Sequence, residues 1–379
     1  MRYDVIIIGA GSMGMAAGYY LAKEGKKVAL VDSNDPPHIK GSHHGETRLI
    51  RHGYGEGEKY VPLALRSQEL WYELENESNR KLFHKTGVLN IGTKESTFLK
   101  NVIQSAKRYD LNAEVLNAVD INRRWEGYHL NEDLLACYEP NAGVLMSEEA
   151  IQAYRELAIQ YGADLFLNEN VERIDIQSDH VTIGLKDKRL HGNQLIITAG
   201  KGTNKITALF EQELPLTPIR KTFSWFQAAE EKYKIGSFPA WSFDNGQAVF
   251  YGFPSMNKSG PKIGRHDGGI PLTKGEELAS FGSYTEDEED VTEFAKQTMS
   301  ETLIHKLGKV CTYTNSPDGD FIIDRFKEYP HVMIACGFSG HGFKFSSAIG
   351  EVLSQMAIKG NSTQDISFFS LDRFKQGSF

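Results

Sequence analysis

Five side chains that can carry positive charge lie close together near the start of the chain. They fall within residues 43–52 of a protein whose formal net charge is −8. Taken alone, such a run is most simply a solvated basic loop. Its position favours an anion-binding site, because the loop leaves the carboxyl end of a strand in what we predict to be a doubly wound sheet, where ligands bind. The residues are His43, His44, Arg48, Arg51 and His52.

The elements that must position these side chains begin at the N-terminus. Residues 4–8 form a short apolar run typical of a buried parallel strand, and the sequence GAGSMG follows directly. A helix is predicted directly after this sequence, and a second strand is predicted over residues 27–32. This order predicts a dinucleotide site, in which Gly9, Gly11 and Gly14 let backbone N–H groups approach a pyrophosphate.

An acidic residue completes the dinucleotide pattern. Asp32 ends the second predicted strand, where a carboxylate accepts hydrogen bonds from the adenosine ribose hydroxyls. An acid there disfavours the 2′-phosphate of NADP, but the pattern leaves FAD and NAD open. The alternative is a glycine-rich turn that binds no ligand. It explains the combination of strand, glycines, helix and acid less well than a dinucleotide site does. No carboxylate with metal-ligand spacing lies near the histidines, so we predict no metal site.

Composition and charge narrow the class of protein. A chain of 379 residues suggests two domains or three, and its net charge of −8 argues against a general nucleic-acid binder. No stretch approaches the roughly 20 apolar residues of a membrane span, and the first strand leaves no room for a signal peptide. Cys137, Cys311 and Cys336 are too few for a disulfide framework. We therefore predict a cytoplasmic globular protein without nucleic-acid or membrane partners.

The order of the predicted elements indicates two intertwined domains. Strand-like runs return after an insert, and no Pro- or Ser-rich linker separates two halves. We predict an α/β fold in which a second, mixed-sheet domain is inserted into a Rossmann-like domain. The Rossmann-like domain comprises residues 1–80, 148–210 and 310–379, and the inserted domain comprises residues 81–147 and 211–309.

Local patterns predict further details of these domains. Ser147 is expected to cap a helix, and residues 285–288 read as a capping box whose acidic side chains are solvated. Cys311 and Tyr313 alternate along a predicted strand and therefore point to the same face. A glycine-rich loop over residues 337–344 opens a helix and offers a second anion site.

Several separate stretches, together spanning nearly the whole chain, resemble one known family. The family comprises the FAD-dependent N-methyl amino acid oxidases, which include monomeric sarcosine oxidase and N-methyl-L-tryptophan oxidase. Two stretches, over 262–269 and 311–318, resemble the tryptophan-derivative oxidase more. The matching stretches are residues 41–45 with Thr47 and Arg48, 251–254, 262–264 with His266, 311–313 and 340–344.

The resemblance implies an FAD-binding Rossmann-like domain and a substrate domain, with FAD attached through the Cys311 sulfur to the flavin 8α-methyl group. It also implies that Arg51 and Lys344 bind the substrate carboxylate. A carboxylate entering a dry pocket must be paired, and an arginine fork offers two hydrogen bonds. Further cofactor contacts are implied for Ser42, Thr47, Val171, Gly340 and Phe343.

The resemblance also implies a reaction. A hydride passes from the N-methyl carbon to FAD, and O2 and water complete the conversion to the primary amino acid, formaldehyde and hydrogen peroxide. Lys262 is expected to activate O2, with Arg48 and His44 near the flavin. Arg48, Lys262 and His266 would lower the pKa of the substrate amine. Tyr251 and Tyr313 are expected to line the cavity.

One stretch departs from the family pattern. Residues 200–202 read Gly-Lys-Gly where the family usually has Gly-Ala-Trp or Gly-Thr-Trp, which leaves local packing and substrate choice open. A flavin dehydrogenase with an acceptor other than O2 is the main alternative function. An NAD-dependent oxidoreductase and a non-catalytic FAD-binding protein are two others. We expect a monomer acting on a small N-methyl amino acid.

Overall fold

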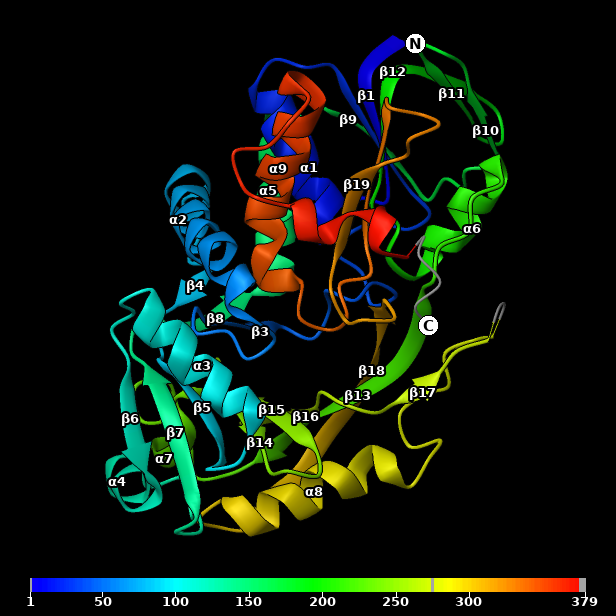
Figure 1. The fold of residues 1–379 in the computed structure, drawn as a ribbon. Helices are drawn as coiled ribbons and strands as arrows, with labels where there is room; N and C mark the ends of the chain where they lie inside the picture. The colour runs from blue at the N-terminus through cyan, green and yellow to red at the C-terminus, as the bar shows by residue number, and fades with distance from the viewer. Residues whose placement is uncertain (1, 274–275, 375–379) are drawn as a thin grey trace.

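Two large β-sheets and a small third sheet organise the chain (Figure 1). The computed structural model describes residues 2–273 and 276–374. The expected domain segments also reach residues 1, 274–275 and 375–379, which lie outside the described residues. Among the described helices, none combines the length and apolar character that a membrane crossing requires.

The eight-stranded sheet has the order β10-β11-β12-β1-β2-β9, and β20 joins it beside β12 and carries β19. Strands β12, β1, β2 and β9 are parallel neighbours, as the dinucleotide pattern predicts. The strands are β1 (Arg2–Ile8), β2 (Val28–Asp32), β9 (Asp164–Leu167), β10 (Arg173–Ile176), β11 (Val181–Gly184), β12 (Arg189–Ile197), β19 (Ile322–Arg325) and β20 (Val332–Cys336).

Three helices pack together beside this sheet (Figure 1). They are α1 (Ser12–Lys23), α5 (Ser147–Gln160) and α9 (Ser346–Lys359). Small residues allow the close approach, because a Cβ added to Gly350 would lie 2.6 Å from the Ala16 Cβ. The tight packing fixes the N-terminus of α1 at the carboxyl end of β1.

The nine-stranded sheet has the order β17-β13-β16-β15-β14-β5-β7-β6, with β18 paired to β13. Helix α8 (Glu286–Thr298) covers part of it, and Phe294 of that helix stacks on Trp241 and Phe250. The strands are β5 (Val88–Thr93), β6 (Glu114–Asn117), β7 (Leu134–Glu139), β13 (Thr217–Gln227), β14 (Ala240–Asp244), β15 (Val249–Phe253), β16 (Lys262–Arg265), β17 (Ile270–Pro271) and β18 (Ile304–Asn315).

The small sheet has the order β3-β8-β4 and joins segments that are distant in the sequence. Its strands are β3 (Thr47–Ile50), β4 (Phe83–His84) and β8 (Gly143–Met146). The other helices are α2 (Val61–Ser78), α3 (Thr97–Arg108), α4 (Ala118–Arg124), α6 (Thr203–Thr207) and α7 (Glu230–Tyr233). Short 3₁₀ helices are η1 (Glu58–Tyr60), η2 (Gly200–Gly202), η3 (Ala208–Phe210), η4 (Phe343–Phe345), η5 (Ser367–Phe369) and η6 (Leu371–Phe374).

The predicted α/β fold class is confirmed, with a Rossmann-like parallel sheet and a second, mixed sheet. The last crossover between the two sheets lies later than residue 310. Strand β18 pairs with β13 along its whole length up to Asn315, so the chain returns to the eight-stranded sheet only at β19. Sequence alternation identifies such a strand but does not reveal which sheet will accept it.

Two predicted helix caps are wrong, although both helices form. Helix α5 begins at Ser147 itself, whose hydroxyl is buried without a hydrogen-bond partner. At the start of α8, the Thr285 side chain makes no capping hydrogen bond. Asp287 is not solvated but buried, and its two oxygens accept hydrogen bonds from the Arg220 guanidinium at 2.6 and 2.7 Å. Asp287 is therefore buried because it pairs with Arg220, an arginine on β13 that is distant in the sequence.

Candidate active site

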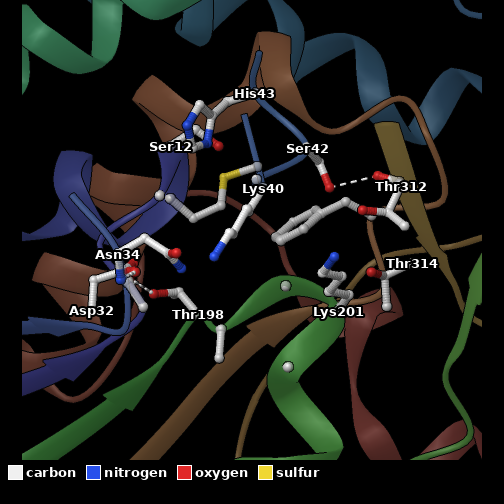
Figure 2. Close-up of a pocket in the computed structure, with 18 of the residues that line it drawn as sticks. Ser12, Asp32, Asn34, Lys40, Ser42, His43, Thr198, Lys201, Thr312 and Thr314 are labelled. Carbon is white, nitrogen blue, oxygen red and sulfur yellow. Dashed lines mark hydrogen bonds between the residues drawn. The ribbon is translucent and has the colours of Figure 1, made fainter. Parts of the chain in front are cut away.

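A cavity of about 340 Å³ lies at the carboxyl ends of the parallel strands (Figure 2). We call it the first cavity. Gly9 and Gly11, in the turn between β1 and α1, form part of its wall. Gly9 has a φ of +95°, and a Cβ there would lie 2.5 Å from the Thr198 carbonyl oxygen. Only glycine fits this turn, so the backbone itself faces the cavity.

Asp32 lines the same cavity at the end of β2. Its carboxylate accepts hydrogen bonds from the backbone N–H groups of Ala10 and Asn34, each at 2.8 Å. Burial would raise the pKa of Asp32, but the hydrogen bonds from His38, Asn34 and Ala10 lower it. A carboxylate therefore stands at this end of the cavity, as a ribose hydroxyl requires.

Gly14, the last glycine of the pattern, lies outside the cavity lining. A Cβ at this position would lie 1.9 Å from the Gly9 carbonyl oxygen. Gly14 therefore serves the close packing of α1 against the end of β1 rather than direct contact with a ligand. Four other residues that the resemblance implies for the cofactor do line the first cavity: Ser42, Val171, Gly340 and Phe343.

A second cavity of about 250 Å³ adjoins the first. Arg48, Tyr313, Gly340 and Phe343 line both cavities, so the two share a wall. The fold brings distant segments together here, because β3, β15, β18 and η4 all contribute residues. The other implied site residues in its lining are Arg51, Tyr251, His266, Cys311 and Lys344.

Arg51 and Lys344 are both buried cations of the second cavity. Arg51 Nη2 donates to both carboxylate oxygens of Glu56 at 2.8 Å, and Nη1 donates to the Gly53 carbonyl oxygen at 3.1 Å. Lys344 Nζ donates to the His341 carbonyl oxygen at 2.7 Å. Glu56 is thus paired with the arginine that the resemblance assigns to a substrate carboxylate.

The cations and Glu56 shift one another's proton affinities. Burial and the Arg51 charge lower the pKa of Lys344 to about 7, while Glu56 acts in the opposite direction. Burial would raise the pKa of Glu56, but the charges of Arg51, His341 and Lys344 hold it well below its ordinary value. Glu56 is therefore ionised near neutral pH, and Lys344 is poised to gain or lose its proton.

Cys311 and Tyr313 lie on β18 and line the second cavity together, as their alternation predicts. Burial raises the pKa of the Cys311 thiol, and the charges of Arg48, Lys221 and Lys262 counteract part of that rise. The cationic loop is fastened to β18 on both sides of Cys311. Its contacts are the Ser42 hydroxyl to the Thr312 carbonyl oxygen at 2.6 Å and the His44 ring to the Val310 carbonyl oxygen at 2.7 Å.

Lys262 lies behind the wall of the second cavity, not in its lining. The side chain is 2% exposed, and Nζ donates to the carbonyl oxygens of Gly45 and Thr47 at 2.7 and 3.1 Å. Nζ also lies 4.3 Å from the ring centroid of Phe253, which does line the cavity. Burial, reinforced by the Arg48 charge, lowers the pKa of Lys262 well below its ordinary value.

The positive charge at the shared wall comes from Arg48 rather than from histidine. The Arg48 guanidinium donates to the carbonyl oxygens of Thr47, Ser42 and His44 at 2.7 Å, and within residues 2–273 and 276–374 it has no carboxylate partner. Burial lowers the pKa of His266 and of His44 to about 4. Both imidazoles are therefore neutral near pH 7, which differs from the charge that the sequence suggests for His266. His44 and Thr47 line neither cavity.

The first cavity fits a dinucleotide on its own chemistry. The glycine cradle at Gly9 and the Asp32 carboxylate stand at one end, and Thr314 contributes a buried hydroxyl without a hydrogen-bond partner among the described residues. Sequence reasoning missed Glu56, His341 and Lys40, which also line the cavities. The one sequence signal for Glu56 is an acid five residues after Arg51, which local spacing alone does not single out.

Comparisons with known proteins agree with this geometry. A family model described as FAD dependent oxidoreductase matches residues 4–356. The chain is 47% identical to monomeric sarcosine oxidase of Bacillus sp. (strain B-0618) over 375 residues, which is 98% of this chain and 96% of that protein. It is 41% identical to N-methyl-L-tryptophan oxidase of Yersinia pestis (strain Pestoides F) over 376 residues, covering 99% and 100%.

A solved structure of NikD, an unusual amino acid oxidase essential for nikkomycin biosynthesis, shares the fold. It superimposes with a TM-score of 0.86 at 20% identity and covers 97% of each chain. Over the whole chain, identity is higher to the sarcosine oxidase than to the N-methyl-L-tryptophan oxidase. The resemblance of residues 262–269 and 311–318 to the N-methyl-L-tryptophan oxidase is therefore not matched by the identity over the whole chain.

Proposed function

The chain belongs to the family of FAD dependent oxidoreductases, and we propose that it is an oxidase that demethylates N-methyl amino acids. The secondary amine, O2 and water would give the primary amino acid, formaldehyde and hydrogen peroxide. The observation that carries the proposal is the shared wall between the two cavities. It places two buried cations, Arg51 and Lys344, in the space next to the dinucleotide cavity.

The substrate carboxylate would bind to Arg51 and Lys344. A carboxylate that leaves water needs a charged partner, and an arginine fork provides two parallel hydrogen bonds. Glu56 already accepts from one nitrogen of that fork, because Arg51 Nη2 donates to both of its carboxylate oxygens. Substrate binding therefore exchanges an internal carboxylate for an external one, so part of the binding free energy is spent on displacing Glu56.

The substrate amine must be neutral to react, and the chain's charges favour that form. Arg48 is a cation of the shared wall that pairs with no carboxylate in the described part of the chain, so it would lower the pKa of an ammonium group nearby. His266 is neutral and contributes polarity and shape rather than charge. Bound FAD would supply the acceptor for the two electrons released from the N-methyl carbon. Tyr251 and Tyr313 would form the cavity wall around the amino acid.

Assays of hydrogen peroxide test the proposed function. Sarcosine, N-methyl-L-tryptophan and other N-methyl amino acids are each incubated with the holoprotein in air, and the matching primary amino acids serve as controls. We expect peroxide and formaldehyde in equal amounts from the N-methyl compounds only. If a dye is reduced while O2 is not consumed, the protein is instead a dehydrogenase with another acceptor.

We further propose that the Cys311 sulfur is bonded to the flavin. Cys311 is a buried residue of the second cavity, and nearby Arg48, Lys221 and Lys262 offset part of the rise in thiol pKa that burial causes. After acid precipitation we expect the yellow colour to stay with the polypeptide, and Cys311→Ser should release it into the supernatant. Cys137→Ser is the matched control and should retain the colour, because Cys137 is buried outside both cavities. Colour released from the unmodified chain would disprove the bond.

The pKa of Lys344 predicts a pH dependence of carboxylate binding. A bound carboxylate favours the charged form of Lys344, whose pKa in the free chain is lowered to about 7. Binding is therefore strongest below that pH and weakens as pH rises through it. For a carboxylate inhibitor without an amine, we expect the Kd to increase about tenfold from about pH 6 to about pH 8. Lys344→Met should flatten this dependence, and a persistent slope would assign it to another group.

A cytoplasmic monomer is also part of the proposal. Among the described residues the three cysteines form no disulfide, which is typical of a reducing compartment. The relatives with 46–47% identity are named monomeric. Sedimentation of the purified holoprotein tests the monomer.

A further inference from the structure

Two lysines outside the implied site residues reach into the first cavity (Figure 2). Lys40 belongs to the loop between β2 and β3, and Lys201 belongs to η2 after β12. Both line the first cavity. In Figure 2 their side chains extend from different segments into the same space.

No carboxylate neutralises these two lysines. Over residues 2–273 and 276–374, neither ammonium group has an ion pair or a hydrogen bond with another side chain or the backbone. The two charges also influence each other, because burial and then the Lys40 charge lower the pKa of Lys201. Like charges that approach without a partner repel, so an anion between them would relieve an unfavourable interaction.

The place of the lysines along the cavity identifies the anion. Asp32, at one end, is suited to the adenosine ribose, while Thr312 and Tyr313 stand next to Cys311 at the other. Figure 2 shows Lys40 and Lys201 in the region between Asp32 and Thr312. In FAD, the group between the ribose and the flavin side is the pyrophosphate, which carries the negative charge of the molecule.

We propose that Lys40 and Lys201 bind the pyrophosphate of the dinucleotide, in addition to the backbone N–H groups of the turn between β1 and α1. The inference rests on the proposed function in so far as the first cavity holds FAD. Lys201 is the middle residue of the Gly-Lys-Gly sequence at 200–202 that departs from the family pattern. Among the described residues a Cβ at Gly202 would meet only the Ala199 Cβ, at 4.0 Å, so the space beside Lys201 is open.

Titration of FAD into the full chain with Cys311→Ser tests the proposal, because the flavin then binds reversibly. Lys40→Gln, Lys201→Gln and the double variant are compared with Lys85→Gln. Lys85 is exposed and lies outside both cavities, so its replacement changes the net charge equally. At low salt we expect each cavity variant to raise the Kd for FAD about tenfold, as for a charged hydrogen bond. The difference should shrink as salt screens the charges.

Riboflavin, which has no phosphate, separates charge recognition from a structural effect. Its affinity should be the same in all variants. An FAD Kd within about twofold of the parent protein, or an equal loss of riboflavin affinity, would overturn the inference. A parent protein that binds no flavin would overturn the proposed function as well, so the two failures are distinguishable.

A second measurement covers the case in which Cys311→Ser does not fold. The apoprotein with Cys311 intact is mixed with FAD well below saturation, and the rate of covalent incorporation is followed. Lys40→Gln and Lys201→Gln should slow incorporation about tenfold at low salt, and Lys85→Gln should not. An unchanged rate in both cavity variants would overturn the inference.

Discussion

Replacing Lys262 by methionine is expected to slow the reaction with O2 by about 10²–10³-fold while leaving oxidation of the amine under argon nearly unchanged. The lysine lies behind the Phe253 side of the second cavity and touches no part of the substrate space. Its effect would therefore be exerted at a distance by the protonated side chain, although burial lowers the pKa of Lys262, because a charge in a dry environment interacts most strongly. Loss of the side chain also removes one of the two donors at each of the Gly45 and Thr47 carbonyl oxygens, which keep the Thr47 N–H and Arg48 respectively.

Stopped-flow measurements separate the two half-reactions of this variant. Bleaching of the yellow colour by substrate under argon reports amine oxidation, and its return on mixing with O2 reports the oxygen reaction. Lys262→Arg keeps a cation and is the matched control, which should retain much of the oxygen reactivity. Equal slowing of both half-reactions in Lys262→Met would point to a packing defect and remove Lys262 from the proposed role.

Replacing Arg51 by methionine should lower kcat/KM for an N-methyl amino acid by about a hundredfold or more. The change removes a two-hydrogen-bond partner of the substrate carboxylate, and truncating one member of a buried charge pair costs about 2–5 kcal/mol. It also leaves the ionised Glu56 without its guanidinium partner. To the extent that Glu56 stays ionised without Arg51, its carboxylate would repel the substrate in the same cavity.

Glu56 variants distinguish these two contributions. Glu56→Gln removes the internal competitor for Arg51, so KM should fall below that of the parent protein. The double variant Arg51→Met with Glu56→Gln should recover part of the loss seen in Arg51→Met, because the repulsion is gone. If Glu56→Gln raises KM as much as Arg51→Met does, Glu56 holds Arg51 in its productive position and the competition argument fails. Steady-state assays at constant ionic strength are sufficient.

The parts of the fold that were predictable are those set by short-range order. The strand, glycine turn, helix and acid from residue 4 to Asp32 follow one another in the sequence, and the parallel pairing of β1 and β2 follows directly. Alternation along β18 likewise placed Cys311 and Tyr313 on one face. The gathering of β3, β15, β18 and η4 around one cavity came only from the family resemblance, because no local pattern encodes it.

The features that sequence reasoning missed all depend on pairing between distant segments. Asp287 reads as a solvated helix start until Arg220 on another element is seen to bind it. The neutral state of His266 results from burial under surrounding elements, which its sequence neighbours do not report. Glu56 lies near Arg51 in sequence, yet only the loop geometry turns that proximity into an ion pair in which Nη2 reaches both carboxylate oxygens.

The interleaving of the two sheets along the chain limits how the protein can be rebuilt. The eight-stranded sheet draws on residues 2–32, 164–197 and 322–336, whereas the nine-stranded sheet draws on 88–139 and 217–315. No single cut would release either sheet as one continuous polypeptide. In a chimera made by joining two relatives at one crossover point, each sheet would contain strands from both parents. Transfer of substrate preference between relatives therefore requires several segments to be grafted at once.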